Sequence, residues 1–280
     1  MTTSPPSGPP DIPARSRAIE LEVEVPGTPE EVWEAIATGP GVTSWYVPFE
    51  VEPREDGRIT LDFGTFGRVE AVVSALDRPH RFAYRGAREE EPLAHEWIVE
   101  GRGRGTCVVR LVNSGFGEGD DWDLQYDAMG EGWQIFLQSL RLHLTHHRGE
   151  RASAVVSSVL LSGPHRAAWD RFCQEMGLRS DLGPGDTVRT GAGSPALAGR
   201  VESVLRTAHA TTYLLLLDQP ATGTGFITVE GDGEQVAGSV YLYLYGGDDQ
   251  LGRMWPAWLA ERFPPMTELL PADAYTSPVE

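Results

Sequence analysis

Hydrophobic and polar positions alternate strictly near the start of the chain. From residue 18 to residue 25, apolar side chains are separated by glutamates, the period of a β-strand with one buried and one solvated face. Thr28 and Pro29 follow, with two glutamates directly behind them. A threonine cap, a proline in the first turn and early carboxylates together predict a helix start. We expect this helix to be short and to end at the Gly-Pro-Gly sequence of residues 39–41.

Several short strands and one long helix are predicted to follow. Runs of β-branched and aromatic residues are separated by turn signals such as Glu55-Asp56-Gly57, which is typical of antiparallel strands. Apolar residues then predict a long helix over 124–147, and the second half repeats the order and ends in a helix over 251–262. The expected strands are 49–51, 58–63, 67–75, 81–85, 95–100 and 107–113, and then 154–161, 187–189, 198–205, 211–217, 225–230 and 236–245.

A sequence echo explains why the two halves look alike. The segment GRVEAVV, which begins at Gly67, returns as GRVESVL from Gly199. A repeat of this spacing is a whole domain and is far longer than a solenoid unit. The sequence therefore predicts a tandem duplication. Further matches occur in the same order: Pro29 and Trp33 with Pro164 and Trp169, Val99-Glu100-Gly101 with Val229-Glu230-Gly231, and Trp133 with Trp255.

The repeat divides the chain into two domains of the α+β class. We expect a disordered leader at 1–16, a first domain at 17–149, a second domain at 152–265 and a loose tail at 266–280. The length of 280 residues suits two domains, each large enough to bury a core without a metal or a disulfide. The leader is rich in proline and serine but lacks an apolar segment, so we do not interpret it as a signal peptide.

A set of residues in the first half carries a family resemblance. They are the strand at 19–25, the helix start at 29–33, Thr43-Ser44-Trp45-Tyr46, the segment at 67–73, the aromatic strand at 82–84 and Gly132-Trp133 with the apolar helix behind it. With this set, residues 18–147 resemble the START-like superfamily SRPBCC, and within it the heat-shock-protein-90 ATPase-activator-like branch. The second half carries only the repeat-level echoes and lacks the Trp-Tyr pair, so we interpret it as a divergent copy.

The resemblance implies two tandem helix-grip (START-like) domains, each a curved antiparallel sheet wrapped around a long C-terminal helix. It also implies a hydrophobic ligand cavity between sheet and helix. Phe82 and Tyr84 share one strand face by alternation, and Trp45 and Trp122 lie in loop-like segments and are expected nearest the cavity mouth. Aromatic walls suit a flat apolar ligand, although aromatic clusters also serve as ordinary core, and both readings stay open here. The candidate ligand-binding residues are Trp45, Tyr46, Phe82, Tyr84, Trp97, Trp122, Trp133 and Phe136.

Charge and composition exclude several classes of function. The formal net charge of −18 repels phosphate backbones, which argues against nucleic-acid binding. No run of 18 apolar residues is present, so no membrane span is expected. The basic residues are all arginine, which removes lysine Schiff-base chemistry and the P-loop lysine. Only Cys107 and Cys173 occur, one in each half, which suggests reduced, inert thiols in a cytoplasmic protein.

The histidines offer two further candidates. His143, His146 and His147 lie near the end of the long helix at a spacing that shares one face. No carboxylate lies in the same turn, and imidazolium groups are favourable at a helix C-terminus anyway, so we expect a solvated helix end without a metal. No cofactor is predicted. An inward-facing His95 would provide an acid–base group.

Three functions compete. The leading prediction is a cytoplasmic protein that binds a small hydrophobic or aromatic ligand, without evident catalysis and with no catalytic residue identified. A polyketide aromatase/cyclase-like enzyme is the first alternative, and it requires a titratable group facing the ligand. A co-chaperone-like modulator of a protein partner is the second, and it requires an exposed docking surface. Bacterial relatives of this branch carry the activator label widely, so the label alone does not predict a chaperone partner.

Overall fold

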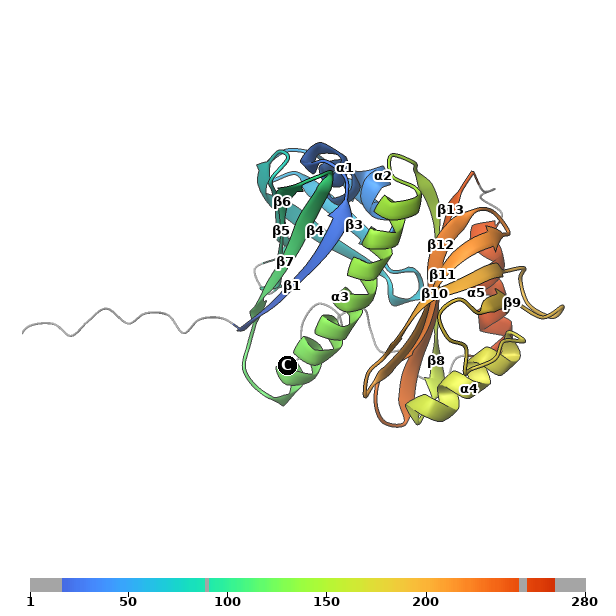
Figure 1. Cartoon of the computed structure of the whole chain (residues 1–280). Coiled ribbons are helices and arrows are strands. Elements are labelled where there is room, and N and C mark those ends of the chain that lie inside the picture. The colour runs from blue at the N-terminus through green and yellow to red at the C-terminus, as the bar shows by residue number, and fades with distance from the viewer. Residues whose placement is uncertain (1–16, 89–90, 247–250, 265–280) are drawn as a thin grey trace, which may run out of the picture.

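A computed structural model describes residues 17–88, 91–246 and 251–264 of the chain. These residues form two antiparallel sheets, and helix α3 (Asp120–His146) lies between them (Figure 1). The predicted α+β class with two tandem helix-grip domains is confirmed. The predicted leader at 1–16 and tail at 266–280 lie outside the described residues.

The first domain is built on a seven-stranded sheet with the order β1-β7-β6-β5-β4-β3-β2. Two short helices and α3 cover its inner face, and its outer face carries the charged side chains of the alternating strands. The strands are β1 (Arg17–Pro26), β2 (Phe49–Val51), β3 (Arg58–Asp62), β4 (Arg68–Asp77), β5 (Arg81–Gly86), β6 (Ala94–Gly103) and β7 (Thr106–Phe116), and the short helices are α1 (Pro29–Ala37), α2 (Gly39–Thr43) and the 3-10 turn η1 (Gly64–Phe66).

Local sequence accounts for the start of this domain. Val23 and Val25 are buried, whereas the glutamates between the apolar positions of β1 are exposed, as the alternation predicts. The Thr28 hydroxyl accepts a hydrogen bond from the Glu31 amide, and the Glu31 carboxylate accepts one from the Thr28 amide, which forms a capping box at α1. Helix α1 ends just before residues 39–41, as predicted, but these residues also begin a second short helix. The Thr38 side chain caps α2, and Pro40 lies in the first turn of this helix, where a proline is readily accommodated.

The second domain repeats the strand order with one strand fewer. Its sheet has the order β8-β13-β12-β11-β10-β9, so in both sheets the first strand pairs with the last and the others follow in reverse sequence. Helices α4 and α5 cover the face that points away from the first domain (Figure 1). The elements are β8 (Ala152–Ser162), α4 (His165–Glu175), β9 (Thr187–Arg189), β10 (Ala198–Arg206), β11 (Ala210–Gln219), β12 (Gly223–Glu230), β13 (Gln235–Tyr245) and α5 (Leu251–Arg262).

The second sheet is buried on both faces. On β13, Leu242 and Leu244 pack in the core beneath α4 and α5, whereas Tyr241 and Tyr243 belong to the core of the first domain. Strands covered on both sides tend to be apolar throughout, and β11, β12 and β13 are buried along most of their length. The two domains therefore share a hydrophobic core around α3.

Polar groups of the segment after α2 and of the C-terminal end of α3 contact the second domain. The Tyr243 hydroxyl donates to the Tyr46 carbonyl at 2.7 Å, and His143 Nδ1 lies 2.6 Å from the Tyr245 hydroxyl. The His147 ring stacks on Tyr245 with centroids 3.8 Å apart. The expected solvated histidine end was thus wrong for His143 and His147, which are 2% and 8% exposed, because the second domain covers this face of the helix.

Other predicted features concern what the described part of the chain lacks. In residues 17–88, 91–246 and 251–264, no helix combines the length and apolar character needed to span a bilayer. The same residues hold no group of three or more His, Cys, Asp or Glu side chains arranged to bind a metal ion. Cys107 and Cys173 are both free and buried, and burial raises the pKa of each thiol, as expected of inert thiols.

Candidate functional site

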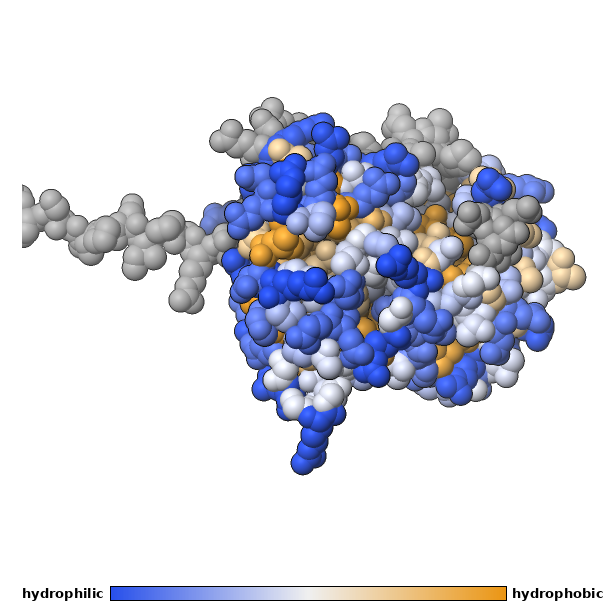
Figure 2. Space-filling model, turned by 90° about the horizontal axis from the view of Figure 1, so that it is seen from above, coloured by the Kyte–Doolittle hydropathy of each residue, from blue (hydrophilic) through white to orange (hydrophobic). Residues whose placement is uncertain are grey.

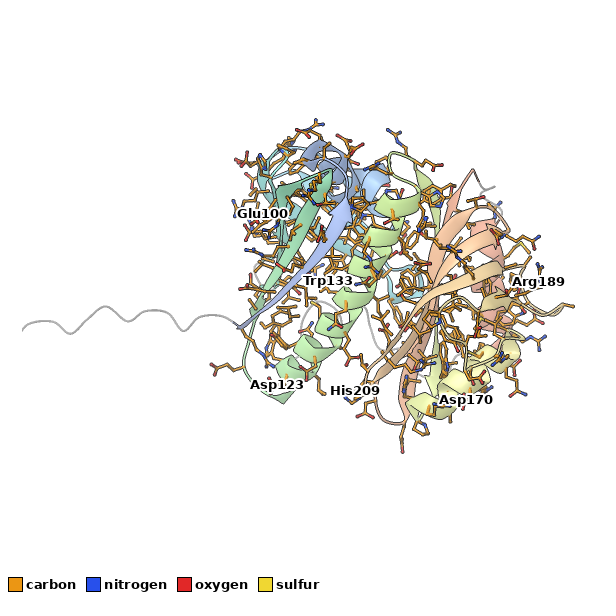
Figure 3. The ribbon with its side chains drawn as sticks, viewed as in Figure 1. Glu100, Asp123, Trp133, Asp170, Arg189 and His209 are labelled. Carbon is orange, nitrogen blue, oxygen red and sulfur yellow. The ribbon has the colours of Figure 1, made fainter. Side chains whose placement is uncertain are left out.

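A cavity of about 520 Å³ lies where the N-terminal half of α3 separates the two sheets. The inner face of the first sheet, the helix and the outer face of the second sheet each contribute to its lining. Figure 3 marks two of the lining residues, Trp133 on α3 and His209 in the second domain. The cavity therefore belongs to both domains, whereas the sequence led us to expect one enclosed between the sheet and helix of a single domain.

Small side chains on α3 help to keep this space open. Ala128 and Gly132 both line the cavity. A Cβ atom placed on Gly132 would meet no other atom within 4 Å, so nothing packs against the helix at this point. One turn further along, Phe136 fills the gap and contacts the second sheet. The size of the residues on this helix face thus decides where the sheets are separated and where they are bridged.

Aromatic rings form the end of the cavity nearest the middle of α3. Trp133 lies 5.0 Å from Tyr46 between ring centroids, and Phe136 lies 5.4 Å from Phe226. Phe226 and Tyr241 stack at 4.6 Å on neighbouring strands of the second sheet. Such offset and edge-to-face contacts make a rigid apolar surface. Both domains supply rings to it, so the surface exists only when the two domains are packed together.

His95 on β6 faces the cavity beside these rings. Its imidazole stacks on Tyr84 at 4.8 Å and approaches Trp133 edge-on at 5.5 Å. Burial among these groups lowers the pKa of His95 from 6.5 to about 4, because the charged form loses its hydration. The imidazole is therefore neutral near pH 7 and can accept or donate a hydrogen bond there. The sequence left the direction of this side chain open and named His95 only as an acid–base group if it faced inward.

The other end of the cavity is acidic. Glu230 at the end of β12 and Glu131 on α3 both line it, and Glu131 accepts a hydrogen bond from the Thr207 hydroxyl at 2.8 Å. Burial, and to a lesser degree the charge of Glu131, raises the pKa of Glu230 from 4.5 to about 7. His209 lies 3.7 Å from Asp232 at the same end. This end can therefore hold a proton or a positive charge near neutral pH.

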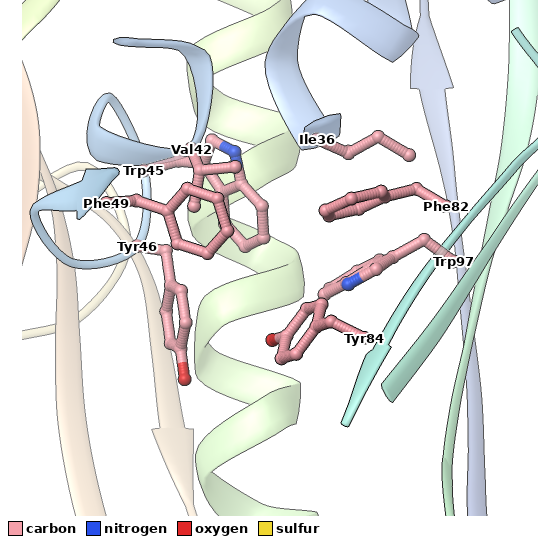
Figure 4. Close-up of a pocket in the computed structure, with 8 residues that line it drawn as sticks. All are labelled: Ile36, Val42, Trp45, Tyr46, Phe49, Phe82, Tyr84 and Trp97. Carbon is pink, nitrogen blue, oxygen red and sulfur yellow. The ribbon is translucent and has the colours of Figure 1, made fainter. Parts of the chain in front are cut away.

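The structure divides the eight predicted aromatic residues into three groups. Tyr46, Tyr84, Trp133 and Phe136 line the cavity. Trp45, Phe82 and Trp97 instead surround a void of about 10 Å³ in the first domain, which is room for a single water (Figure 4). These three side chains pack as core.

Trp45 and Trp122, the two residues expected at the cavity mouth, lie elsewhere. Trp45 is 1% exposed, and its indole donates to the Ala35 carbonyl at 2.8 Å, so a loop-like sequence here is a buried anchor. Trp122 packs edge-on against Phe116 at 6.3 Å in a small separate cluster near the start of α3. Neither lines the large cavity.

Sequence analysis missed the residues that the second domain contributes. Phe226, Glu230 and Tyr241 come from strands that were predicted as strands but were not connected with a site. The sequence did contain a signal that could have pointed to this second face. The runs at 213–217 and 240–245 are apolar or aromatic without interruption, which is typical of a sheet covered on both faces. A second covered face implies a partner surface, here the first domain.

The surface seen from above is mainly hydrophilic. In this view hydrophobic residues appear in small patches among hydrophilic ones (Figure 2). Scattered apolar residues of this kind are ordinary on protein surfaces, whereas docking sites tend to carry larger continuous patches. The cavity is therefore a better candidate for a binding site than this face of the described residues.

One family matches part of the chain. Residues 26–145 match the family described as Activator of Hsp90 ATPase homolog 1-like protein. The match spans less than half of the chain and falls on the first domain, and it supports an SRPBCC, Aha1-like fold. No protein of curated function matches the chain.

Several solved structures are similar in fold. DynU16, from the dynemicin biosynthetic locus, is 17% identical, covers 87% of this chain and 93% of its own, and has a TM-score of 0.43. The Aha1 dimer from Colwellia psychrerythraea is 18% identical over 48% of this chain and 99% of its own, with a TM-score of 0.41. CalU16 from Micromonospora echinospora is 20% identical over 47% and 78%, with a TM-score of 0.39. At these identities and TM-scores, none of them bears on function.

Proposed function

We propose that this protein, whose first domain has an SRPBCC, Aha1-like fold, is cytoplasmic and binds a small, largely apolar aromatic ligand in the cavity between its two domains. The cavity itself is the observation that carries the proposal. Its volume of about 520 Å³ lies within the range of small-molecule sites, roughly 300–1,000 Å³, and its lining combines many apolar residues with a few polar ones. Packed protein interiors leave few voids larger than a water molecule, so a space of this size favours an occupant.

The second domain has a defined part in this proposal. We regard it as a divergent copy of the first that supplies one side of the site through Phe226, Tyr241 and Glu230. Its own helices cover its other face, so its outer sheet face is free to act in this way. The ligand would then contact both domains and stabilise their packing by mass action.

A cavity-filling substitution tests the proposal. Gly132→Leu places a side chain into open space, because a Cβ atom there meets nothing within 4 Å. Gln134→Leu is the matched control, since it adds the same side chain to an exposed position of the same helix. Native mass spectrometry of protein from its own cells and calorimetric titration with the neutral probe naphthylmethanol give the readout.

We expect a small molecule to co-purify with the wild type and with Gln134→Leu but not with Gly132→Leu. We also expect Gly132→Leu to bind naphthylmethanol at least tenfold more weakly than the wild type, which corresponds to a loss of about 1.4 kcal/mol in binding free energy. If neither a small molecule nor probe binding is found in the wild type, the proposal is rejected. A co-purifying polypeptide in place of a small molecule would instead favour the modulator of a protein partner.

One observation favours the enzyme alternative. Neutral His95 and the partly protonated Glu230 line the same cavity from opposite sheets, and an aromatase/cyclase-like reaction needs such a base and acid. If the cavity catalyses ring closure, an aromatic poly-β-ketone probe is cyclised by the wild type and left unchanged by His95→Gln. Equal conversion by both proteins excludes catalysis by His95.

A further inference from the structure

The charged residues of the cavity are of one sign. Five carboxylates line it, and among the described lining residues none is an arginine, although the chain as a whole carries 23 basic residues. The two lining histidines, His95 and His209, are the only bases among those described residues. The carboxylates are Glu91, Asp127, Glu131, Glu230 and Asp232.

From this asymmetry we infer that the ligand is an aromatic molecule that carries a positively charged nitrogen, bound with the nitrogen towards Glu230 and Glu131 and the ring towards Trp133 and Phe226. The inference rests on the proposed function and specifies the ligand class for the same cavity.

Glu230 is the residue that most needs such a partner. Its carboxylate makes no hydrogen bond or ion pair within residues 17–88, 91–246 and 251–264. Glu131 adds a like charge nearby and accepts a hydrogen bond from the Thr207 hydroxyl. A carboxylate without a partner in a poorly hydrated site is costly, and the cost is removed by a proton or by a cation. An ammonium group in the cavity meets this need directly.

Some other acidic residues of the chain have a basic partner. Glu100, which the sequence repeat aligns with Glu230, lies on the outer face of the first sheet with Arg110 at 3.6 Å and Arg102 at 3.8 Å. Within the cavity, Asp232 has His209 and Glu91 has Arg88 at 3.8 Å. Within the described residues, Glu230 thus lacks the arginine partners that its counterpart Glu100 has.

The aromatic end suits the rest of such a ligand. Trp133, Tyr46, Phe226 and Tyr241 present ring faces and edges to one space. Aromatic faces attract cations as well as flat apolar groups, so these rings also tolerate the approach of an ammonium group. An anionic ligand is disfavoured, since His95 is neutral at pH 7 and the five carboxylates repel negative charge.

Three matched probes test the inference by calorimetric titration at a pH of about 8, where Glu230 is ionised. They share one ring and differ in charge: naphthylmethylamine is cationic, naphthylmethanol neutral and naphthoate anionic. We expect the amine to bind the wild type at least about tenfold more tightly than the alcohol, and naphthoate to bind weakest. In Glu230→Gln this preference should fall below about threefold, while Glu100→Gln keeps it in full.

Each outcome decides between the two proposals. If the alcohol binds as tightly as the amine, or if Glu230→Gln keeps the preference, the cationic ligand class is wrong and the ligand cavity stands. An equal loss in Glu230→Gln and Glu100→Gln means that net charge alone attracts the amine, which also overturns the inference. If none of the three probes binds to the wild type, the inference is wrong, and if no small molecule co-purifies with the wild type either, the proposed function fails as well.

Discussion

The two halves of α3 meet the second domain in different ways. Over its C-terminal half, Leu140, His143 and Leu144 are almost fully buried, and the second sheet closes on the helix through Tyr243 and Tyr245. Over its N-terminal half, the same helix and the same two sheets leave a cavity of about 520 Å³. The difference lies in the side chains. The closed half is rich in leucine and histidine, whereas the open half carries alanine, glycine and acids at the corresponding places.

This contrast shows how one interface can provide both stability and a site. A tightly packed end fixes the relative position of the two sheets. Small and charged residues at the other end then leave a space with a constant shape, since the packed end prevents collapse. Substitutions in the packed end should therefore change stability, and those in the open end should change binding.

The largest effect is expected at the packed end. Tyr243 is 0% exposed, and its hydroxyl donates to the Tyr46 carbonyl across the domain interface. Tyr243→Ala leaves a void and removes this hydrogen bond, and we expect the free energy of unfolding to fall by about 3–5 kcal/mol in urea denaturation. Leu124→Ala, at a side chain of α3 that is 70% exposed, is the control and should change it by less than about 0.5 kcal/mol. If both variants lose a similar free energy of unfolding, the packed end is not what stabilises the contact between the domains.

The stability that the packed end provides should also depend on pH. Burial, followed by the nearby His147, lowers the pKa of His143 from 6.5 to about 4. Between these values the unfolded chain binds a proton that the folded protein does not, so stability is complete above pH 6.5 and falls by roughly 3 kcal/mol as the pH drops to 4. His95 adds to the loss in the same window.

Denaturation at several pH values measures this slope. We expect His143→Gln to flatten it partly, because His95 remains, and the double variant with His95→Gln to flatten it further. His146→Gln, at the exposed histidine of the same helix end, should leave it unchanged. A slope that is the same in His143→Gln as in the wild type would contradict the assignment.

At the open end, the predicted sequence repeat pairs Glu230 with Glu100. In the folded protein the pKa of Glu230 is raised from 4.5 to about 7. Between these two pH values the folded protein therefore holds a proton that the unfolded chain lacks, and stability is lost as the pH rises through 7. Glu230→Gln should therefore stabilise the ligand-free protein by roughly 1–3 kcal/mol near pH 8 and by almost nothing near pH 4. Glu100→Gln removes only exposed ion pairs and should change stability by less than about 0.5 kcal/mol at both pH values. Thermal unfolding of both variants measures the difference.

The smallest effect compares two glycines of α3. Gly130 and Gly132 are both helical, and an added Cβ meets only Ile19 Cδ1 at 3.9 Å from the first and nothing within 4 Å from the second. Either glycine to alanine change should stabilise the protein by about 0.5–1 kcal/mol through helix propensity. Only Gly132→Ala narrows the cavity, so it alone should weaken naphthylmethanol binding in a titration. Equal binding losses in both variants would show that the helix, and not the cavity, is responsible.

Much of the fold followed from local sequence. The alternation of β1 fixed which face is buried, and Thr28 with Glu31 marked the start of α1 through a capping box. The order of strands in the second half followed from the echo of the first, and the same order is found in both sheets. These features depend on neighbours within a few residues, or on resemblance between segments, and both can be read from the chain alone.

The site depended on contacts that no local pattern contains. Trp45 and Trp133 are both buried tryptophans of the first half, yet one anchors the core through Ala35 and the other faces a cavity. The sequence treats Glu100 and Glu230 as equivalent, but only the packing of the second sheet against α3 places Glu230 in a cavity without a cation while Glu100 stays in solvent beside two arginines. Sequence by itself determined the elements, their order and the faces that must be buried. The tertiary structure alone decided which surfaces bury one another, because the two domains meet through residues that are far apart in the chain, such as Tyr46 and Tyr243.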